Sequence, residues 1–355
     1  MNSKKAIQFL TVIFFVGILL SITLYLGLDG LTPAPPSEES EDGRTHAFNR
    51  SFYGDELIAS FVKYCDYKIF HHIENKTIIS GQDDWLFETV REDNGYDYVM
   101  DYLGGCPYSE EQMAQIAHTI SLRRQACAER NSDYLLVIIP NSMTVASEHL
   151  PVYMGSQSQN TRLRKLMAYM HEQRDPSVLD LRGIMKGSSE KEELYNNTED
   201  SINAYGAFFI YDSVLSQLEM MGRDVEEYRL SVDSIQFFTH YTDGKTVARQ
   251  AELEHVISNR TISLSENMTD FYGTSEATEH CVSTVMENRR GNEDRLVIEC
   301  SGEWDKIQLM PFFSNTFETV VYENSIGDGV SALDYHKGTV LIQVIHESEL
   351  DLLLG

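Results

Sequence analysis

Two polar segments of this 355-residue chain hold the hydroxyl and carboxylate side chains from which a nucleophilic site is built. The first is Tyr195-Asn-Asn-Thr-Glu-Asp-Ser-Ile-Asn-Ala-Tyr-Gly-Ala207, and the second is Val297-Ile-Glu-Cys-Ser-Gly302. A serine hydroxyl needs an adjacent base to become nucleophilic near neutral pH, and imidazole is the usual base. Neither segment contains a histidine, so the chemistry open to their serines depends on the rest of the chain.

Histidines of the C-terminal half are the first candidates for such a base: His240, His280, His336 and His346, the last of which follows a predicted strand end. A histidine at such a position is more often a surface or loop residue than a base. Cys300 is a second candidate nucleophile, but a cysteine that continues an apolar strand is more often buried or disulfide-bonded. The carboxylates of Glu199 and Asp200 could hold a cation. More often such a pair lies in a solvated loop or at a helix N-terminus, so we predict no metal site and no cofactor.

Alternating helices and strands must position these segments. Apolar residues at helical spacing predict four helices, at residues 52–68, 108–130, 162–173 and 204–222. Ser109 is the predicted N-cap of the second helix. Short apolar runs predict buried strands: 133–140, 177–181, 294–300, 318–322 and 338–345. This alternation predicts an α/β fold with a doubly wound, mostly parallel sheet.

Two parts of the chain do not fit that alternation. A turn at Gly81 opens into an aromatic strand in which Trp85 and Phe87 are predicted core residues rather than a platform for sugars. Residues 223–292, rich in Glu, Ser, Thr and Asn, are predicted to form an insert in the domain.

The N-terminal residues predict a membrane anchor. Residues 6–28 form a nearly unbroken apolar run, long enough to cross a bilayer as a helix. The run is longer than the apolar part of a signal peptide and no convincing cleavage site follows it, so we expect an uncleaved anchor, with cleavage as the alternative. Lys4 and Lys5 precede it, which places residues 1–5 in the cytoplasm. Residues 29–50, rich in Pro, Ser and Glu, then form a flexible linker to an extracellular domain, 51–355, at the cell membrane.

The amino-acid composition limits the kinds of partner that this protein can bind. Asp and Glu number 55 against 28 Lys and Arg, and so acidic a surface repels phosphate backbones and argues against nucleic-acid binding. Outside the cytoplasm disulfides are permitted, and the odd number of cysteines leaves at least one thiol free. None of the five has the C-x-x-C spacing of a structural zinc site: Cys65, Cys106, Cys127, Cys281 and Cys300.

Several short motifs, taken in order, resemble the alginate O-acetyltransferase AlgX/AlgJ family and its Gram-positive Asp-His-His-Trp relatives, both within the SGNH hydrolase-like group. Residues 81–87 are similar to that family's GKDGWLF strand. Residues 138–145 with Leu150-Pro151 are similar to its IPPNKxxVY…LP segment, and residues 178–181 to its VLDL strand. The resemblance runs from roughly residue 78 to 349 and implies an SGNH hydrolase-like α/β fold.

The family's next landmark, T-D-x-H-W-N-x-x-G-A, is similar to residues 198–207. Asn203, Gly206 and Ala207 match it, which supports the fold. Glu199 stands at the family's Asp position and Ser201 at its His position. A glutamate can replace an aspartate as an acceptor, but its task would be to orient a histidine that is absent there.

The family's last landmark is a buried strand ending in G-D-S, and the resemblance puts Ser301 at the position of the nucleophile. Cys300 replaces the carboxylate beside it, and Glu299 replaces a glycine at which the backbone is expected to turn sharply. These departures favour a degenerate catalytic site.

The resemblance implies transfer of acetyl groups to a cell-surface polysaccharide through a seryl intermediate, with a membrane-bound O-acyltransferase as the supplying partner. One hypothesis is a pseudoenzyme, an accessory or polysaccharide-binding protein of an export or modification complex. The alternative is an active O-acetyltransferase or esterase that uses Ser301. A plain extracellular structural protein is a third class. The missing histidine at position 201 favours the pseudoenzyme hypothesis.

Overall fold

The computed structural model describes residues 63–355 except 70–72, 174–176, 190–192, 266–271, 278–281, 289, 324–325 and 327–338. All of them belong to one compact unit, Ala59–Gly355. The predicted anchor at residues 6–28 and the linker at 29–50 lie outside the described residues. Within the described part, no helix combines the length and the apolar composition that crossing a membrane requires.

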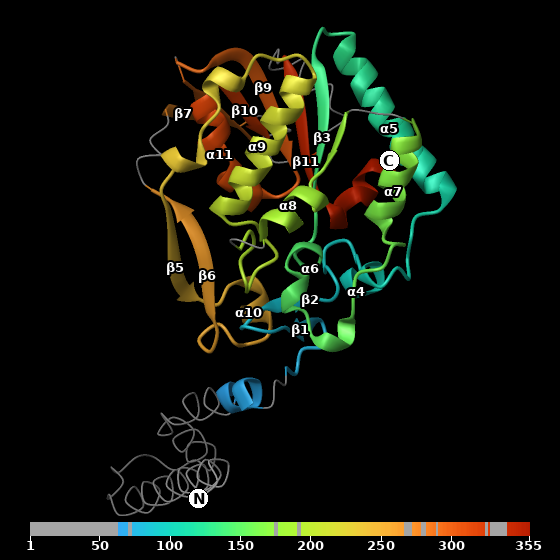
Figure 1. The fold of residues 1–355 in the computed structure, drawn as a ribbon, viewed down its shortest axis with the longest axis vertical. Coiled ribbons are helices and arrows are strands. Elements are labelled where there is room, and N and C mark those ends of the chain that lie inside the picture. Colours follow the sequence, from blue (N-terminus) through green and yellow to red (C-terminus); the bar gives the residue numbers. More distant parts are fainter. Residues whose placement is uncertain are drawn as a thin grey trace, which may run out of the picture. The chain divides into compact units, whose positions relative to one another are not determined.

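A seven-stranded sheet forms the centre of the domain, in the spatial order β4-β3-β11-β9-β10-β8-β7 (Figure 1). The strands from β4 to β10 pair in parallel, whereas β8 and β7 are antiparallel additions at one edge. This arrangement confirms the predicted mostly parallel sheet. The strands are β3 (Asp133–Ile139), β4 (Val178–Asp180), β7 (Tyr272–Ala277), β8 (Val282–Glu287), β9 (Asn292–Cys300), β10 (Phe317–Glu323) and β11 (Val340–His346).

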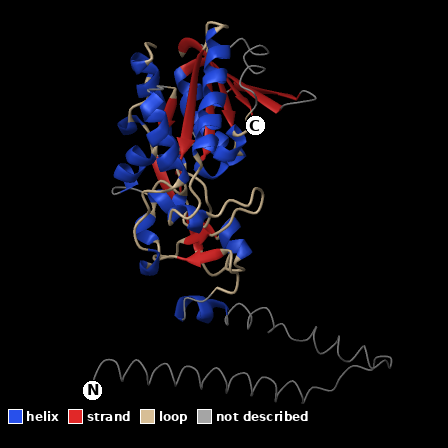
Figure 2. Ribbon diagram, turned by 90° about the vertical axis from the view of Figure 1, so that its right-hand side faces the viewer, coloured by secondary structure: helices blue, strands red, loops and turns tan. Residues whose placement is uncertain are grey.

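Helices cover both faces of the sheet, as expected for a doubly wound fold (Figures 1 and 2). Alternate strand residues enter two separate apolar cores: Ile298 and Ile342 pack toward α8, α9 and α11, whereas Val297 and Leu341 pack toward α5 and α7. The helices are α4 (Tyr98–Tyr102), α5 (Glu110–Ala128), α6 (Ser142–Val145), α7 (Arg162–Gln173), α8 (Arg182–Ser189), α9 (Ala204–Met220), α10 (Thr246–Gln250) and α11 (Glu303–Thr316). Short 3-10 turns include η1 (Ser147–His149), η2 (Val152–Met154), η3 (Glu226–Tyr228), η4 (Val232–Ser234) and η6 (Glu347–Leu353).

Local sequence signals set most of these boundaries. Helix α7 has the predicted bounds, and α5 begins after the predicted N-cap Ser109, whose hydroxyl accepts from the Gln112 amide at 3.2 Å. The Gln112 side chain accepts from the Ser109 amide in return, which completes a capping box. Residues 63–69 are helical, within the helix predicted over 52–68 and one residue beyond it.

A smaller antiparallel sheet precedes the main one, with β1 (Ile78–Ser80) paired to β2 (Leu86–Glu88). Trp85 and Phe87 are each 1% exposed, which confirms them as core residues. Between the strands, Asp83 and Asp84 both adopt positive φ, at 55° and 63°, and the Lys68 ammonium binds the Asp84 carboxylate at 2.6 Å.

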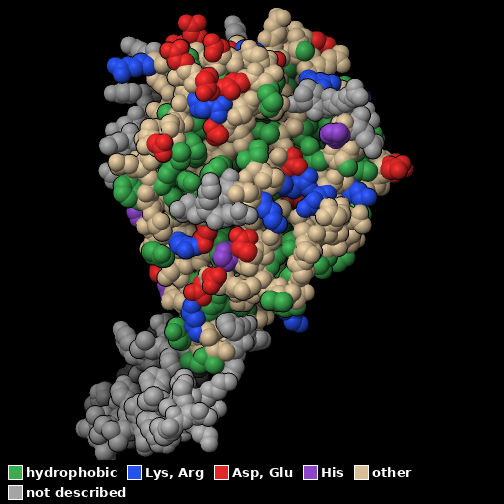
Figure 3. Space-filling model, in the orientation of Figure 1, with side chains coloured by type: hydrophobic (Ala, Val, Ile, Leu, Met, Phe, Trp, Pro, Cys, Tyr) green, Lys and Arg blue, Asp and Glu red, His purple; other side chains and the backbone are tan. Residues whose placement is uncertain are grey.

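The segment predicted as an insert, residues 223–292, forms two structures. Strands β5 (Phe237–Asp243) and β6 (Ser258–Leu264) make an antiparallel pair whose connection contains α10, and β7 and β8 extend the main sheet. On the face drawn in Figure 3, acidic and basic side chains are interspersed.

Candidate functional site

The candidate residues gather at the carboxyl edge of the parallel sheet, where ligands of open α/β sheets bind. Ser301 follows β9, and His346 is the last residue of the neighbouring strand β11. The two strands pair with Cys300 opposite Val344, and the Ser301 amide donates to the Val344 carbonyl at 3.1 Å. The register therefore carries Ser301 and His346 to the same edge of the sheet.

The Ser301 hydroxyl is enclosed. Its Oγ is buried and has no hydrogen-bond partner among the described residues. Ser301 lies directly before Gly302, the residue that precedes α11, so the positive end of that helix is adjacent. Such an unpaired buried hydroxyl costs about 1–3 kcal/mol, and native structures make such exceptions where there is a reason for them.

Cys300 confirms the expectation of a buried residue. Its thiol is free and fully buried in the core shared with α9 and α11. Burial, reinforced by the carboxylate of Asp305, raises the pKa of the Cys300 thiol far above its ordinary value. A thiol that stays protonated is a poor nucleophile, so this geometry argues against Cys300 as a replacement for Ser301. Cys281 lies outside the described residues.

The sharp turn expected at Glu299 is wrong. Glu299 is an internal residue of β9, opposite Gln343 of β11, and its carboxylate accepts from the Gln343 amide at 2.5 Å. The Gln343 carbonyl oxygen accepts from Arg123 and from the Tyr134 hydroxyl, each at 2.7 Å. Glu299 therefore belongs to a buried polar network within the sheet. The strand continues through Cys300, and the chain turns into α11 only after Gly302.

The matched Asn203, Gly206 and Ala207 fix how the polar segment meets α9. The Asn203 side chain accepts from the amides of Tyr205 and Gly206 at 2.9 and 3.0 Å, and so caps the helix. At Gly206 a Cβ atom would come within 2.3 Å of the Leu194 carbonyl oxygen. Only glycine lets the chain entering the segment pass this close to the first turn of α9.

Neither Glu199 nor Ser201 is hydrogen-bonded to the Ser301 hydroxyl, whose oxygen has no partner among the described residues. The Ser201 hydroxyl accepts from the Asn196 side chain at 2.9 Å. The Glu199 carboxylate lies at 3.5 Å from the Thr246 hydroxyl of α10, and burial raises its pKa. The structure therefore places hydroxyl and carboxylate groups, with no imidazole, at the positions that the family resemblance assigns to Asp and His.

Asp200, which lies between Glu199 and Ser201 in the sequence, is hydrogen-bonded to other elements. Its carboxylate accepts from the Tyr98 hydroxyl at 2.9 Å and from the Ser142 amide at 3.3 Å. The residues described here contain no group of three or more His, Cys, Asp and Glu side chains suited to a metal ion. The solvated carboxylate pair expected from the sequence is thus only partly correct, because Asp200 is tied to α4 and α6.

The segment predicted as an insert holds this loop in place. The Thr198 hydroxyl donates to the Asn259 side chain at 2.7 Å and accepts from the Lys245 amide at 3.0 Å. Asn197 accepts from the Arg260 amide at 2.7 Å. Residues 244–260 therefore hold the loop through these hydrogen bonds, a role that no local sequence signal indicates.

His346 is not the surface histidine expected from the sequence. It is 6% exposed, and its Nε2 lies 2.6 Å from Oδ2 of Asp305, which belongs to the first turn of α11. Burial alone would lower the pKa of His346, but Asp305, Glu349 and Asp200 outweigh it and raise the pKa to about 9. Asp305 carried no sequence signal of its own, since an acidic residue in a first helical turn is common.

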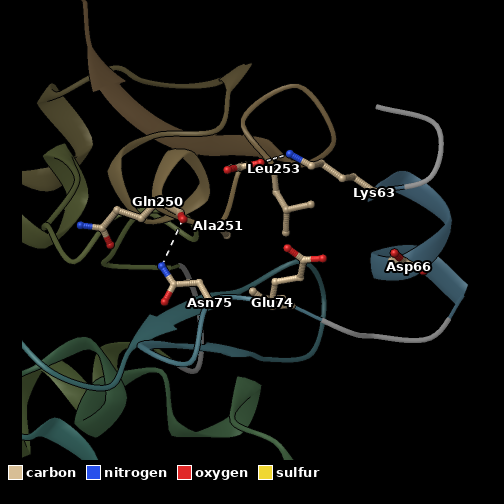
Figure 4. Close-up of a pocket in the computed structure, with 9 residues that line it drawn as sticks. Lys63, Asp66, Glu74, Asn75, Gln250, Ala251 and Leu253 are labelled. Atoms are coloured by element: carbon tan, nitrogen blue, oxygen red, sulfur yellow. Dashed lines mark hydrogen bonds and ion pairs between the residues drawn. The ribbon is translucent and has the colours of Figure 1, made fainter. Parts of the chain in front are cut away.

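The other candidate histidines do not join the His346–Asp305 pair in the described residues. His240 is exposed on β5, as expected for a surface histidine, and His280 and His336 lie outside the described residues. A separate cavity of about 80 Å³ lies between the helix at 63–69 and α10 (Figure 4). Its lining includes the hydrogen bond from Asn75 to the Gln250 carbonyl at 3.1 Å and the ion pair of Lys63 with Glu252.

Comparisons with known proteins agree with this architecture. Residues 78–243 match the family model of the SGNH hydrolase-like domain of the acetyltransferase AlgX. Bacillus cereus PatB1, solved with a sulfonyl adduct, is 13% identical with a TM-score of 0.57, over 79% of this chain and 96% of PatB1. A DHHW family protein from Eubacterium siraeum is 12% identical with a TM-score of 0.51, over 79% of this chain and 95% of that protein.

At such identities the structural likeness concerns the fold alone, and no curated protein matches the sequence. The family match nevertheless includes the strand at Gly81 and the polar segment before α9. Together, the family match and the shared fold confirm the resemblance seen in the sequence: this chain has an AlgX/AlgJ-like, SGNH hydrolase-like domain.

Proposed function

We propose that this domain transfers or hydrolyses acetyl esters on a polysaccharide, with Ser301 as the nucleophile. The observation that carries the proposal is the Ser301 hydroxyl, which lies at the carboxyl edge of the sheet, beside the N-terminus of α11, with no hydrogen-bond partner among the described residues. An unpaired hydroxyl beside the positive end of a helix suits an attacking oxygen and the negative charge that develops on an ester carbonyl.

The substrate class follows from the family. The matching model is that of the SGNH hydrolase-like domain of an acetyltransferase. The sequence resembles the alginate O-acetyltransferase family, and alginate is a polysaccharide. An acetyl ester as donor and a sugar hydroxyl as acceptor would share one seryl intermediate. Water in place of the sugar hydroxyl would make the same site an esterase.

The location is also part of the proposal. The apolar run at residues 6–28, with Lys4 and Lys5 before it, supports a single-pass anchor with the domain outside the cell membrane. A domain held there has no access to cytoplasmic acetyl donors. A membrane-bound O-acyltransferase would then supply the acetyl group.

A second candidate function is a pseudoenzyme, an accessory or polysaccharide-binding protein of a modification or export complex. Glu199 and Ser201 favour it, because Ser201 is bound to Asn196 and neither position supplies an imidazole. In this case the sheet edge would bind sugar without cleaving an ester.

One assay separates the two. The full chain in detergent is tested on a chromogenic acetate ester and on acetylated oligosaccharides, as wild type, Ser301→Ala and the exposed control Ser234→Ala. Activity lost only in Ser301→Ala is the expected result. Activity that survives this substitution, or a wild type without activity that binds the oligosaccharide, would reject the seryl reaction and favour the accessory role.

A further inference from the structure

We propose that His346, positioned by Asp305, is the acid–base residue that serves Ser301, a role relocated from the loop before α9 to the end of β11. The inference rests on the proposed seryl reaction and names the residues that drive it. His346 would be a catalytic residue, because it exchanges a proton with the reacting hydroxyl. Asp305 would be a positioning residue, because it acts through the imidazole.

Backbone geometry brings the pair next to Ser301. The Ser301 amide is bonded to the carbonyl of Val344, two residues before His346 on the adjacent strand. A Cβ atom on Gly302 would lie 2.4 Å from Oδ2 of Asp305, the same oxygen that lies 2.6 Å from the imidazole. The residue directly after Ser301 therefore touches the carboxylate that holds His346, and only a glycine leaves space for it.

The unused hydrogen-bonding atoms also point to this role. His346 Nδ1 and Ser301 Oγ are both buried, and neither has a partner among the described residues. When Nε2–H donates to Asp305, a neutral imidazole leaves Nδ1 as a bare acceptor. This is the arrangement of a carboxylate that sets the tautomer and of a ring nitrogen ready to accept a proton. Hydrogen bonds of this kind are often long in substrate-free structures and tighten when the substrate binds.

His346 and Ser301 account for every proton that moves in the reaction. His346 Nδ1 takes the Ser301 hydroxyl proton while Oγ forms a bond to the ester carbonyl carbon. The resulting imidazolium returns that proton to the departing alcohol as the old ester C–O bond breaks, which leaves acetyl-Ser301. The acceptor hydroxyl, from a sugar or from water, then gives its proton to Nδ1, attacks the acetyl carbon and releases Ser301 with its proton restored.

The charges around His346 predict how the reaction depends on pH. Three carboxylates face the ring from three elements: Asp305 of α11, Glu349 of η6 and Asp200 of the loop before α9. The Arg91 guanidinium pairs with Glu349 at 2.5 Å and partly offsets it. The pKa of His346 is about 9, so the neutral ring is scarce at pH 7 and the rate of attack should rise about tenfold per pH unit until it levels near pH 9.

The test measures Ser301 itself. The full chain is treated with phenylmethylsulfonyl fluoride between pH 6 and 10, and the sulfonyl ester on Ser301 is quantified by mass spectrometry. Four chains are compared with the wild type: Ser301→Ala, His346→Gln, Asp305→Asn and His255→Gln. The last is a matched control, since His255 also pairs with a carboxylate, Asp243 at 3.5 Å, but is 75% exposed.

We expect labelling that levels near pH 9 in the wild type and in His255→Gln. His346→Gln should lower the rate at pH 9 by about a hundredfold or more, the range of general-base catalysis. Asp305→Asn should move the midpoint to lower pH as well as lower the rate, because it removes the main charge that raises the pKa of His346. A merely structural role for Asp305 would lower the rate without moving the midpoint.

Two outcomes would overturn the inference in distinguishable ways. If Ser301→Ala abolishes ester cleavage but His346→Gln keeps the rate and pH profile, the seryl reaction stands and the dyad is wrong. If Ser301 is neither labelled nor needed, both fall. Histidine NMR provides a check that does not depend on activity or on the folding of a variant: the wild-type His346 ring should titrate near pH 9, and titration near 6.5 would refute the buried pair.

Discussion

Replacing Asp305 with asparagine tests the buried ion pair through the stability of the fold. Asn keeps the size of the side chain and a hydrogen-bond acceptor for His346, but removes the charge. The side chains of His346 and Asp305 are 7% and 5% exposed, so solvent screens their interaction little. The effect on the free energy of unfolding should therefore be large and should depend on pH.

The magnitude follows from the pKa of His346. A rise from 6.5 to about 9 corresponds to about 3 kcal/mol of stabilisation, at roughly 1.4 kcal/mol per pH unit. Because the folded-state pKa is the higher one, this stabilisation is fully present below pH 6.5, where the ring is charged in both states. It is lost as the pH rises through about 9. The charge of Asp305 at the N-terminus of α11 adds about 0.3–1 kcal/mol that does not change over this range.

Asp305→Asn should thus lower the free energy of unfolding by about 3–4 kcal/mol at pH 6 and by about 0.3–1 kcal/mol at pH 10. Urea titrations followed by the fluorescence of Trp85 and Trp304 measure both values. Asp212→Asn is the control, since Asp212 pairs with Arg229 at 2.7 Å on a half-exposed surface, where such a pair stabilises by less than about 1 kcal/mol. A loss in Asp305→Asn that is the same at pH 6 and pH 10 would refute a charged His346 in the folded state.

Other perturbations test the geometry around Ser301. Gly302→Ala should push the Asp305 carboxylate away, because its Cβ would lie 2.4 Å from Oδ2; the His346 NMR midpoint should fall toward 6.5, and an unchanged midpoint would contradict this contact. Gln343→Leu should lower the free energy of unfolding by about 2–4 kcal/mol, since it leaves the buried Glu299 carboxylate without its amide donor; a loss below 0.5 kcal/mol in urea titration would argue against the network. Iodoacetamide at pH 8 should modify the partly exposed thiols of Cys65 and Cys106. It should spare the buried thiols of Cys127 and Cys300 until urea unfolds the chain. Rapid labelling of Cys127 and Cys300 in the native protein, detected by mass spectrometry, would count against the packing.

The sequence by itself determined the class of fold and most of its elements. Continuous apolar runs such as that of β3 predict strands buried on both faces, and helical spacing with a capping residue predicts α5, because these signals are local. It also located the segment before α9, where Asn203 and Gly206 act within a few residues of one another. The antiparallel edge strands β7 and β8 were not predicted, since their sequence has no periodicity that separates them from a loop.

Only the tertiary structure decided which groups surround Ser301. The sequence shows that a histidine is missing at Ser201, but not that His346 ends the neighbouring strand with its ring against Asp305. That pairing joins residues 41 positions apart through the register of a parallel sheet and the position of α11. A register between strands depends on long-range packing, so no local pattern in either strand specifies it. The sequence therefore shows that the histidine is absent at Ser201, whereas the buried pair of His346 and Asp305 is visible only in the folded chain.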